Sequence, residues 1–468
     1  MIKAITFLRI LENKGMENNT RNEESCQKSS FEILLEDNYQ NINSDLCKDQ
    51  VKNYVKKYKS IKEENIFFVK KLSKVIHNII QEDNSFFIDD LERIHRYNIE
   101  GVEIIKKLDE EEHRDKNLLS MASHFLGYAG EIAYLIYSKT KSLGWAECCY
   151  RNNRVSARLL QTNNQRYSAY TFGYAGSIAK TIYDESKDIK WLHHWYHAKL
   201  ISAKVAEDTD IKHASYCYSI AGKAAMQIYE NSNKKSWGEL WFHNYKKSAE
   251  LALGNNDKHA AHAFSFAGNA AMKIFINSDD NEWAKQWFDC YVLSGDLSEK
   301  TEVLHSYNSY RIAGNAARDC YKKTNDTDWA KKWYKYLFKS AQLSTTVNLR
   351  HSVNGYSISG DIAEEIYSKT KDISWAENMF KAHMLAADIC KENNPKHSSH
   401  QYSYAGNAAK LMAMHTGEKK WIVDAIKCYE NFLDYYSVND NQKVHKVVKR
   451  INSDVYLLKM SIDELAEE

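Results

Sequence analysis

The chain has little proline and glycine: one proline, Pro395, and 17 glycines among 468 residues. Proline interrupts helices and glycine weakens them, so their scarcity leaves room for long uninterrupted helices. Aromatic residues are plentiful, with 11 Trp, 31 Tyr and 16 Phe available to pack such helices together. This composition predicts an all-α protein.

A charge excess of either sign is also missing, because 64 Lys and Arg stand against 62 Asp and Glu. Proteins that bind nucleic acid usually carry a basic excess that neutralises phosphates. We therefore do not expect nucleic acid to be the partner.

Cysteine motifs and long apolar runs are absent as well. The nine cysteines are odd in number and never spaced C-x-x-C, which indicates neither a disulfide framework nor a zinc site and favours a reducing compartment. No stretch reaches 18 apolar residues, and the apolar runs in residues 1–11 are too short for a signal peptide or a membrane span. We expect a soluble, cytoplasmic protein that needs no cofactor or metal.

The dominant feature that is present is a repeat. Glycine and tryptophan each recur seven times at an unbroken interval of 46 residues. The glycines are Gly130, Gly176, Gly222, Gly268, Gly314, Gly360 and Gly406, and the tryptophans are Trp145, Trp191, Trp237, Trp283, Trp329, Trp375 and Trp421. Such regularity is typical of a solenoid, here of seven stacked units over residues 121–436. Solenoids mostly bind other molecules along a continuous surface, so catalysis is not the first expectation.

Each unit has the pattern of two helices, described here by positions counted from its glycine. Position −4 is aromatic or Leu, −1 is Ala or Ser, +3 is Ala, +6 is mostly Ile and +7 mostly Tyr, which marks a first helix of about 18 residues. A hydroxyl residue at +10 and a polar linker precede the tryptophan at +15, which is predicted to open a second helix of about 16 to 18 residues. Ser236 with Glu239, and Ser374 with Glu377, have capping-box spacing around that start. The pattern predicts a right-handed α/α superhelical solenoid in which the glycine lets two helix axes approach closely.

The flanks of the repeats complete the expected domain organisation. Residues 1–30 are polar and predicted to be disordered. Residues 31–120 carry helical patterns and are predicted to form an N-terminal cap or degenerate repeats, and residues 437–468 a C-terminal capping helix. Caps are expected because the end units of a solenoid would otherwise expose their packing faces.

The first helix of the unit has a familiar sequence. The segments 266–271 (FAGNAA) and 403–409 (SYAGNAA) resemble the first helix of a tetratricopeptide repeat, in which Leu-Gly-Asn-Ala-Tyr is typical. The likeness covers the seven units, although their period of 46 exceeds the 34 of that family and the closing proline is missing. The resemblance implies that the first helices line a concave surface that binds a peptide, and that the Asn after the glycine bonds the peptide backbone. Asn269, Asn315 and Asn407 hold this position, and Asp361 replaces Asn in the sixth unit.

Other large polar residues lie on the same helical face. Position −6 is His or Asn in the last four units, and position −3, one turn later, is small except at Arg311. A buried stripe would not tolerate these residues, so positions −6, −3 and +1 are predicted to form the exposed inner surface. The candidate partner-binding residues are Asn269, Asn315, Asn407, Asp361, His262, Asn308, Arg311, Asn354 and His400.

A histidine also recurs at position −9 in five units, at His213, His259, His305, His351 and His397. One interpretation is a pH-responsive or ligand-binding row, since histidine changes charge near neutral pH. The other is structural: each imidazole lies at a helix start and bonds a neighbouring turn. The regular recurrence of the histidine favours the structural interpretation.

These observations predict a non-catalytic scaffold or adaptor that binds a protein or peptide in the concave groove. One alternative is a helical-repeat protein that binds nucleic acid, which strong weakening of binding by salt would reveal. Another is a small-molecule or metal-dependent enzyme that uses the histidine row, although no glycine-rich phosphate loop, G-x-S-x-G or H-E-x-x-H motif is present.

Overall fold

The computed structural model describes residues 74, 77, 86–112, 116–161, 163–278, 280–438 and 445–467. The segment predicted to be disordered, residues 1–30, lies outside the described residues, as does most of the predicted N-terminal cap before residue 86. The described part of the chain is helical throughout and contains no strand.

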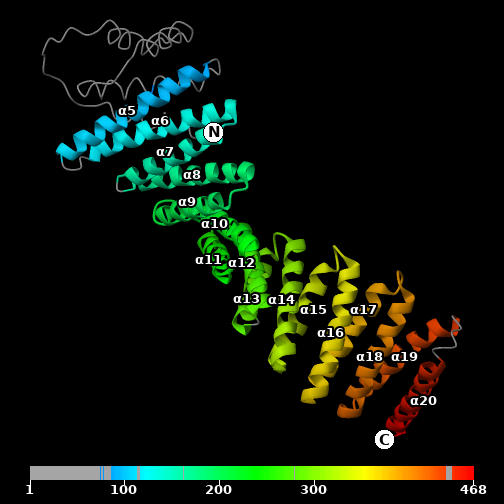
Figure 1. Cartoon of the computed structure of the whole chain (residues 1–468). Coiled ribbons are helices and arrows are strands. Elements are labelled where there is room, and N and C mark those ends of the chain that lie inside the picture. Colours follow the sequence, from blue (N-terminus) through cyan, green and yellow to red (C-terminus); the bar gives the residue numbers. More distant parts are fainter. Residues whose placement is uncertain are drawn as a thin grey trace, which may run out of the picture. The chain divides into compact units, whose positions relative to one another are not determined.

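Seven helix hairpins follow one another along the chain, and each helix packs against the one before it and the one after it (Figure 1). The first helices are α6 (Lys116–Thr140), α8 (Gln165–Ser186), α10 (Ile211–Ser232), α12 (Asp257–Ser278), α14 (Val303–Thr324), α16 (Leu349–Thr370) and α18 (Pro395–Thr416). The second helices are α7 (Leu143–Leu160), α9 (Ile189–Ala206), α11 (Lys235–Ala252), α13 (Asn281–Ser298), α15 (Thr327–Ser344), α17 (Ser374–Cys390) and α19 (Lys419–Val438). α5 (Ile88–Glu112) precedes the hairpins and α20 (His445–Glu467) follows them. This sequential packing defines an all-α solenoid.

The core is built from the small and aromatic positions of the repeat. The alanines at −1 and +3, such as Ala267 and Ala271, have no exposed surface. One apolar cluster runs through the hairpins from α6 to α14, and two others continue it from α14 to α20. α20 joins the last of these clusters through Ile451 and Val455. None of the described helices is long and apolar enough to cross a membrane.

The turn inside each hairpin explains the hydroxyl at +10. Thr324 donates to the carbonyl of Cys320 at 2.9 Å and accepts from the backbone N–H of Asp326 at 3.2 Å. The next residue, Asn325, has a φ of 53° and ends the helix in the left-handed conformation. The first helix therefore continues through +10 and spans 22 residues in α8, α10, α12, α14, α16 and α18, which corrects the predicted length of about 18.

The predicted capping boxes are wrong. α11 begins at Lys235 and α17 at Ser374, and neither the N-cap Lys234 nor the N-cap Ile373 caps its helix through a side chain. Most second helices begin two residues before the tryptophan. Where Asp stands at +12, its carboxylate caps the helix. Asp326, for example, accepts a hydrogen bond from the backbone N–H of Asp328 at 2.9 Å. Asp caps the helix where Lys234 and Ile373 do not, because its short side chain reaches the free N–H groups of the first turn.

The tryptophan at +15 packs between successive units. Trp329 meets the ring of Phe288 edge-on, with centroids 5.4 Å apart, and Trp283 meets Phe242 in the same way at 5.1 Å. Edge-on contacts of this kind also join Tyr150 to Trp191, Tyr196 to Trp237, Tyr334 to Trp375 and Phe380 to Trp421. These rings connect the second helices of neighbouring units.

Candidate functional site

The predicted site residues all lie on the first helices, on a surface that we call the first-helix face and define by positions −6, −3, −2 and +1 of α6 to α18. Asn269 and His262 lie on α12, Asn308, Arg311 and Asn315 on α14, Asn354 and Asp361 on α16, and His400 and Asn407 on α18. None of the nine is buried. Asn354 and Asp361 are exposed and the other seven are half-buried, and the role of all nine in binding stays a prediction.

The first-helix face also carries an apolar row at position −2, which the sequence analysis did not identify. This apolar ridge consists of Tyr128, Tyr174, Ile220, Phe266, Ile312, Ile358 and Tyr404. All seven side chains are large and none is buried, and Phe266, Ile358 and Tyr404 are 42–43% exposed. Every unit therefore presents a hydrophobic side chain to its surroundings between two polar positions.

The glycine that defines the repeat accommodates a side chain from the second helix. In six of the seven units the side chain at +23 lies against the glycine, so closely that an added Cβ would come within 2.4–3.1 Å of it. These side chains belong to Asn153, Lys199, Tyr245, Tyr291, His383 and Tyr429. In the fifth unit Leu337 stands at +23, and an added Cβ at Gly314 would make ordinary contacts alone, with the backbone nitrogen of Leu337 at 3.5 Å and its Cβ at 3.7 Å as well as the carbonyl oxygen of Trp333 at 3.7 Å. The glycine thus makes room for a side chain, whereas the sequence predicted a close approach of helix axes.

Several +23 side chains reach the first-helix face past the glycine. The hydroxyl of Tyr291 donates to Asn269 Oδ1 at 2.6 Å, and that of Tyr429 donates to Asn407 Oδ1 at 2.9 Å. Asn315 has no such donor, because Leu337 takes the place of tyrosine in its unit. Two of the three asparagines predicted to bond a peptide backbone therefore already hold a tyrosine through Oδ1, which leaves the Nδ2 donors for a partner.

The sixth unit places an imidazole at +23. His383 is fully buried, and its Nδ1–H donates to Gln401 Oε1 at 2.7 Å, so Nε2 carries the lone pair. Nε2 has no hydrogen-bond partner among the described residues and lies 4.0 Å from Oδ1 of Asp361. Burial lowers the pKa of His383 to about 4, so the imidazole is neutral at physiological pH.

The remaining predicted residues have varied surroundings. His262 contacts Glu302 through Nε2 at 3.0 Å, and His400 contacts the Tyr436 hydroxyl through Nε2 at 2.9 Å. Asn308 donates to the Leu304 carbonyl of its own helix at 2.9 Å. Arg311 is half-buried and Asn354 is exposed. Their side chains form no single polar cluster, so the face resembles an extended contact surface more than an active site.

The histidines at −9 form part of the packing between units. Ser248 Oγ donates to the Ser215 carbonyl at 2.7 Å and lies 3.0 Å from His259 Nε2, so the serine accepts a hydrogen bond from the imidazole. His213 and His351 meet Ser202 and Ser340 in the same way, and His305 Nε2 lies 2.9 Å from Ser294 Oγ. Burial lowers the pKa of His259, which favours this neutral donor. These contacts give the histidine row a structural role.

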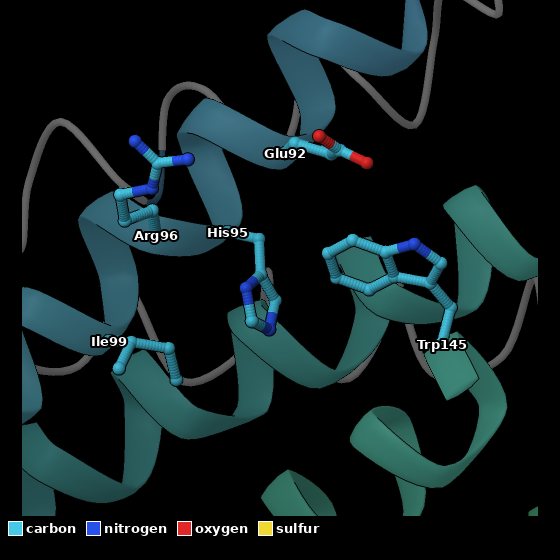
Figure 2. Close-up of a pocket in the computed structure, with 5 residues that line it drawn as sticks. All are labelled: Glu92, His95, Arg96, Ile99 and Trp145. Carbon is cyan, nitrogen blue, oxygen red and sulfur yellow. The ribbon is translucent and has the colours of Figure 1, made fainter.

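A shallow pocket of about 290 Å³ opens between α5 and α7. Figure 2 shows His95 of α5 and Trp145 of α7 side by side in it, with Glu92, Arg96 and Ile99 around them. His95 Nε2 lies 3.3 Å from Cys148 Sγ, but burial lowers the pKa of His95 to about 4 and raises that of the Cys148 thiol. Both shifts favour the neutral groups, the opposite of the thiolate–imidazolium pair that a nucleophilic cysteine requires.

No family model matches the chain, and no curated protein matches it. Among solved structures it is similar to a circular tandem repeat protein (11% identity over 86% of this chain and 97% of that chain, TM-score 0.29). It is also similar to a de novo designed helical repeat protein (14% identity over 61% of this chain and 95% of that chain, TM-score 0.17). A signal transduction ATPase with a tetratricopeptide repeat sensor, from Pyrococcus horikoshii, matches at 14% identity over 94% of this chain and 68% of that chain, with a TM-score of 0.24.

Identities and TM-scores this low do not assign the chain to a family. The class of the protein follows instead from its own helices. Hairpins of 46 residues stack in sequence order around shared apolar clusters. The chain is an all-α helical-repeat protein built of helix hairpins.

Proposed function

We propose that this protein is a non-catalytic scaffold that binds a protein or peptide partner along its first-helix face. The observation that carries the proposal is the apolar ridge at position −2, which is exposed or half-buried in all seven units. The ridge lies beside the polar positions −6 and +1, so apolar contact and hydrogen bonding are available to the same partner.

Exposed apolar side chains on neighbouring units need a reason. Removal of apolar surface from water stabilises a contact by about 25 cal/mol per Å², so a row of large apolar residues left exposed forgoes that stabilisation until another surface covers it. Contacts within the chain cover only part of this surface: Phe266 stacks on Tyr245 and Tyr404 lies against His383, yet both side chains remain exposed. A partner that covers the ridge accounts for its presence in all seven units.

Unpaired thiols support a cytoplasmic setting for this function. All the described cysteines are free, from Cys148 to Cys428, and a reducing compartment keeps them so. We therefore place the proposed scaffold in the cytoplasm, where a protein partner would meet it.

The test is affinity capture from a lysate of the source organism, read by mass spectrometry at low and high salt. The ridge variant carries Phe266→Ser, Ile358→Ser and Tyr404→Ser, at positions 42–43% exposed. We expect the wild-type chain to capture a protein partner that the ridge variant loses.

The matched control removes three apolar side chains of similar exposure from the second helices. It carries Val155→Ser, Leu293→Ser and Val423→Ser, which are 40%, 44% and 47% exposed. The control should retain the partner, and the melting temperature of both variants is measured as well, because Phe266 and Tyr404 also contact the rings of Tyr245 and His383. Capture unchanged by the ridge variant would overturn the proposal, and nucleic acid that disappears at high salt would favour the nucleic-acid alternative.

A further inference from the structure

Lys199, the +23 residue of the second unit, is a buried cation. It is 7% exposed, and its aliphatic stem lies against Gly176, where an added Cβ would come within 3.0–3.1 Å of Cγ, Cδ and Cε. Its ammonium donates to Ser177 Oγ at 2.9 Å. Ser177 is exposed and lies at +1 on the first-helix face, so the ammonium ends beside that face.

The ammonium of Lys199 lacks a counter-charge. No carboxylate lies within 4.0 Å of it among the described residues, although nearby lysines do have acidic partners, as Lys180 has Asp184 and Lys247 has Glu207. Its partner Ser177 is a neutral hydroxyl, while an ammonium has three hydrogens to donate. Burial lowers the pKa of Lys199, which is the expected response of a cation removed from water without compensation.

The tyrosines at +23 of the fourth and seventh units carry no charge that needs compensation. Tyr291 and Tyr429 are neutral, and each donates its hydrogen to an asparagine at +1. A buried charge is unfavourable unless an opposite charge or several hydrogen bonds accompany it. The buried ammonium of Lys199 therefore lacks a negative charge beside it, and a bound anion would supply that charge.

We propose that Lys199 is the anion-binding position of the first-helix face and takes a carboxylate or phosphate group of the bound protein. The inference rests on the proposed function, because it assigns part of the partner's chemistry. Ser177 lies within reach of the same anion, and the exposed Lys223 at +1 of the next unit adds positive charge to the surface there. The exposed Tyr216, at −6 of the next unit, offers a phenol donor on the same face.

The first experiment uses the full chain with lysine labelled at ¹³Cε, observed by NMR. Sodium phosphate and sodium acetate are the probes, and sodium chloride at equal ionic strength is the control. The Lys199→Met variant assigns the Lys199 resonance by its loss, and it preserves the apolar stem against Gly176. Lys180 serves as the internal reference, because Asp184 already pairs with it.

Saturable movement of the Lys199 resonance with phosphate or acetate, absent with chloride, supports the proposal. The titration midpoint of Lys199 should also rise when phosphate is bound, since an anion stabilises the charged ammonium. A Lys199 resonance that moves no more than that of Lys180, or moves equally with chloride, overturns the proposal.

A second experiment separates the two sources of the anion. Three acetylated, amidated tripeptides carry Glu, phosphoserine or Gln between alanines, and their affinities are measured on the same resonance. We expect the better of the two anionic peptides to bind about tenfold more tightly than the Gln peptide, as a charge-assisted hydrogen bond implies. Equal affinity for all three peptides overturns the inference of an anion site. It does not overturn the proposed function, which the capture experiment tests separately. If the ridge variant loses the partner while the three peptides bind equally, the scaffold function is supported and the anion site is not.

Discussion

Three units share the first-helix sequence Ala-Gly-Asn-Ala-Ala, around Gly268, Gly314 and Gly406, yet they differ in what lies over the glycine. At Gly268 an added Cβ would lie 2.6 and 2.7 Å from ring carbons of Tyr291, whereas at Gly314 its nearest neighbour would be the Leu337 backbone nitrogen at 3.5 Å. The same substitution, glycine to alanine, should therefore have opposite effects in two identical local sequences. We expect Gly268→Ala to destabilise the protein and Gly314→Ala to stabilise it.

The magnitudes follow from three contributions. Alanine in place of glycine inside a helix stabilises by about 1 kcal/mol in both variants. At Gly268 the tyrosine ring must move, and such overpacking costs about 1 to 3 kcal/mol. Displacement of the ring also weakens the 2.6 Å hydrogen bond to Asn269, at about 1 kcal/mol. The net expectation is a loss of about 1 to 3 kcal/mol for Gly268→Ala against a gain of about 1 kcal/mol for Gly314→Ala.

Hydrogen exchange read by mass spectrometry is the appropriate assay, because a solenoid loses stability locally, between neighbouring units. Peptides from α12 and α13 should exchange faster in Gly268→Ala, and peptides from α14 and α15 more slowly in Gly314→Ala. Gly406→Ala is an internal replicate of the first variant, since an added Cβ there would lie 2.6 Å from Tyr429. If Gly268→Ala stabilises its unit as much as Gly314→Ala does, the ring does not lie over the glycine and the reasoning fails.

Four further predictions follow from single contacts. Trp329→Ala should lower the free energy of unfolding by about 2 kcal/mol in urea titrations, less than for a buried tryptophan, because the ring is half-buried against Phe288. Ser248→Ala should cost about 1 to 3 kcal/mol in the same assay, because it leaves the buried Ser215 carbonyl and the His259 N–H without their bonds. Asp326→Ala removes a helix cap and should cost about 1 kcal/mol, measurable as faster exchange in α15. His383 alone should lower the free energy of unfolding by about 3 kcal/mol as pH drops from about 6.5 to about 4, because the unfolded imidazole takes up a proton that the folded one, with its pKa lowered to about 4, does not; His383→Gln should remove that share from the pH dependence of the wild type.

Much of the fold could be predicted from the sequence, because the positions that form the core recur in every unit. Alanine at −1 and +3 and the aromatic residue at −4 mark one helical face, and that face is buried. The helix boundaries were less accurate. The hydroxyl at +10 was seen as a marker, but its two backbone hydrogen bonds, which carry the helix through that position, are not visible in a list of residue types.

The candidate surface was predicted in part. Positions −6 and +1 were recognised as exposed because polar residues such as His262 and Asn269 would not be buried in a stripe. The apolar ridge was missed although its signal was available: at 3.6 residues per turn, −2 lies about 40° from −6 and about 60° from +1. Large side chains such as Phe266 and Tyr404 at that angle are therefore on the exposed face.

The +23 residues could not have been placed from the pattern, because they belong to the other helix and vary among Asn, Lys, Tyr, Leu and His. Their variation is itself informative once the glycine contact is known. A packing position is constrained in volume, and the core positions of this repeat vary little, whereas +23 changes in charge, length and hydrogen-bonding capacity from unit to unit. The glycine permits this freedom, since a residue without Cβ accommodates a lysine stem at Gly176 as readily as a tyrosine ring at Gly268. Each unit thus combines a large apolar side chain at −2, exposed or half-buried, with a buried side chain at +23 whose chemistry varies from unit to unit.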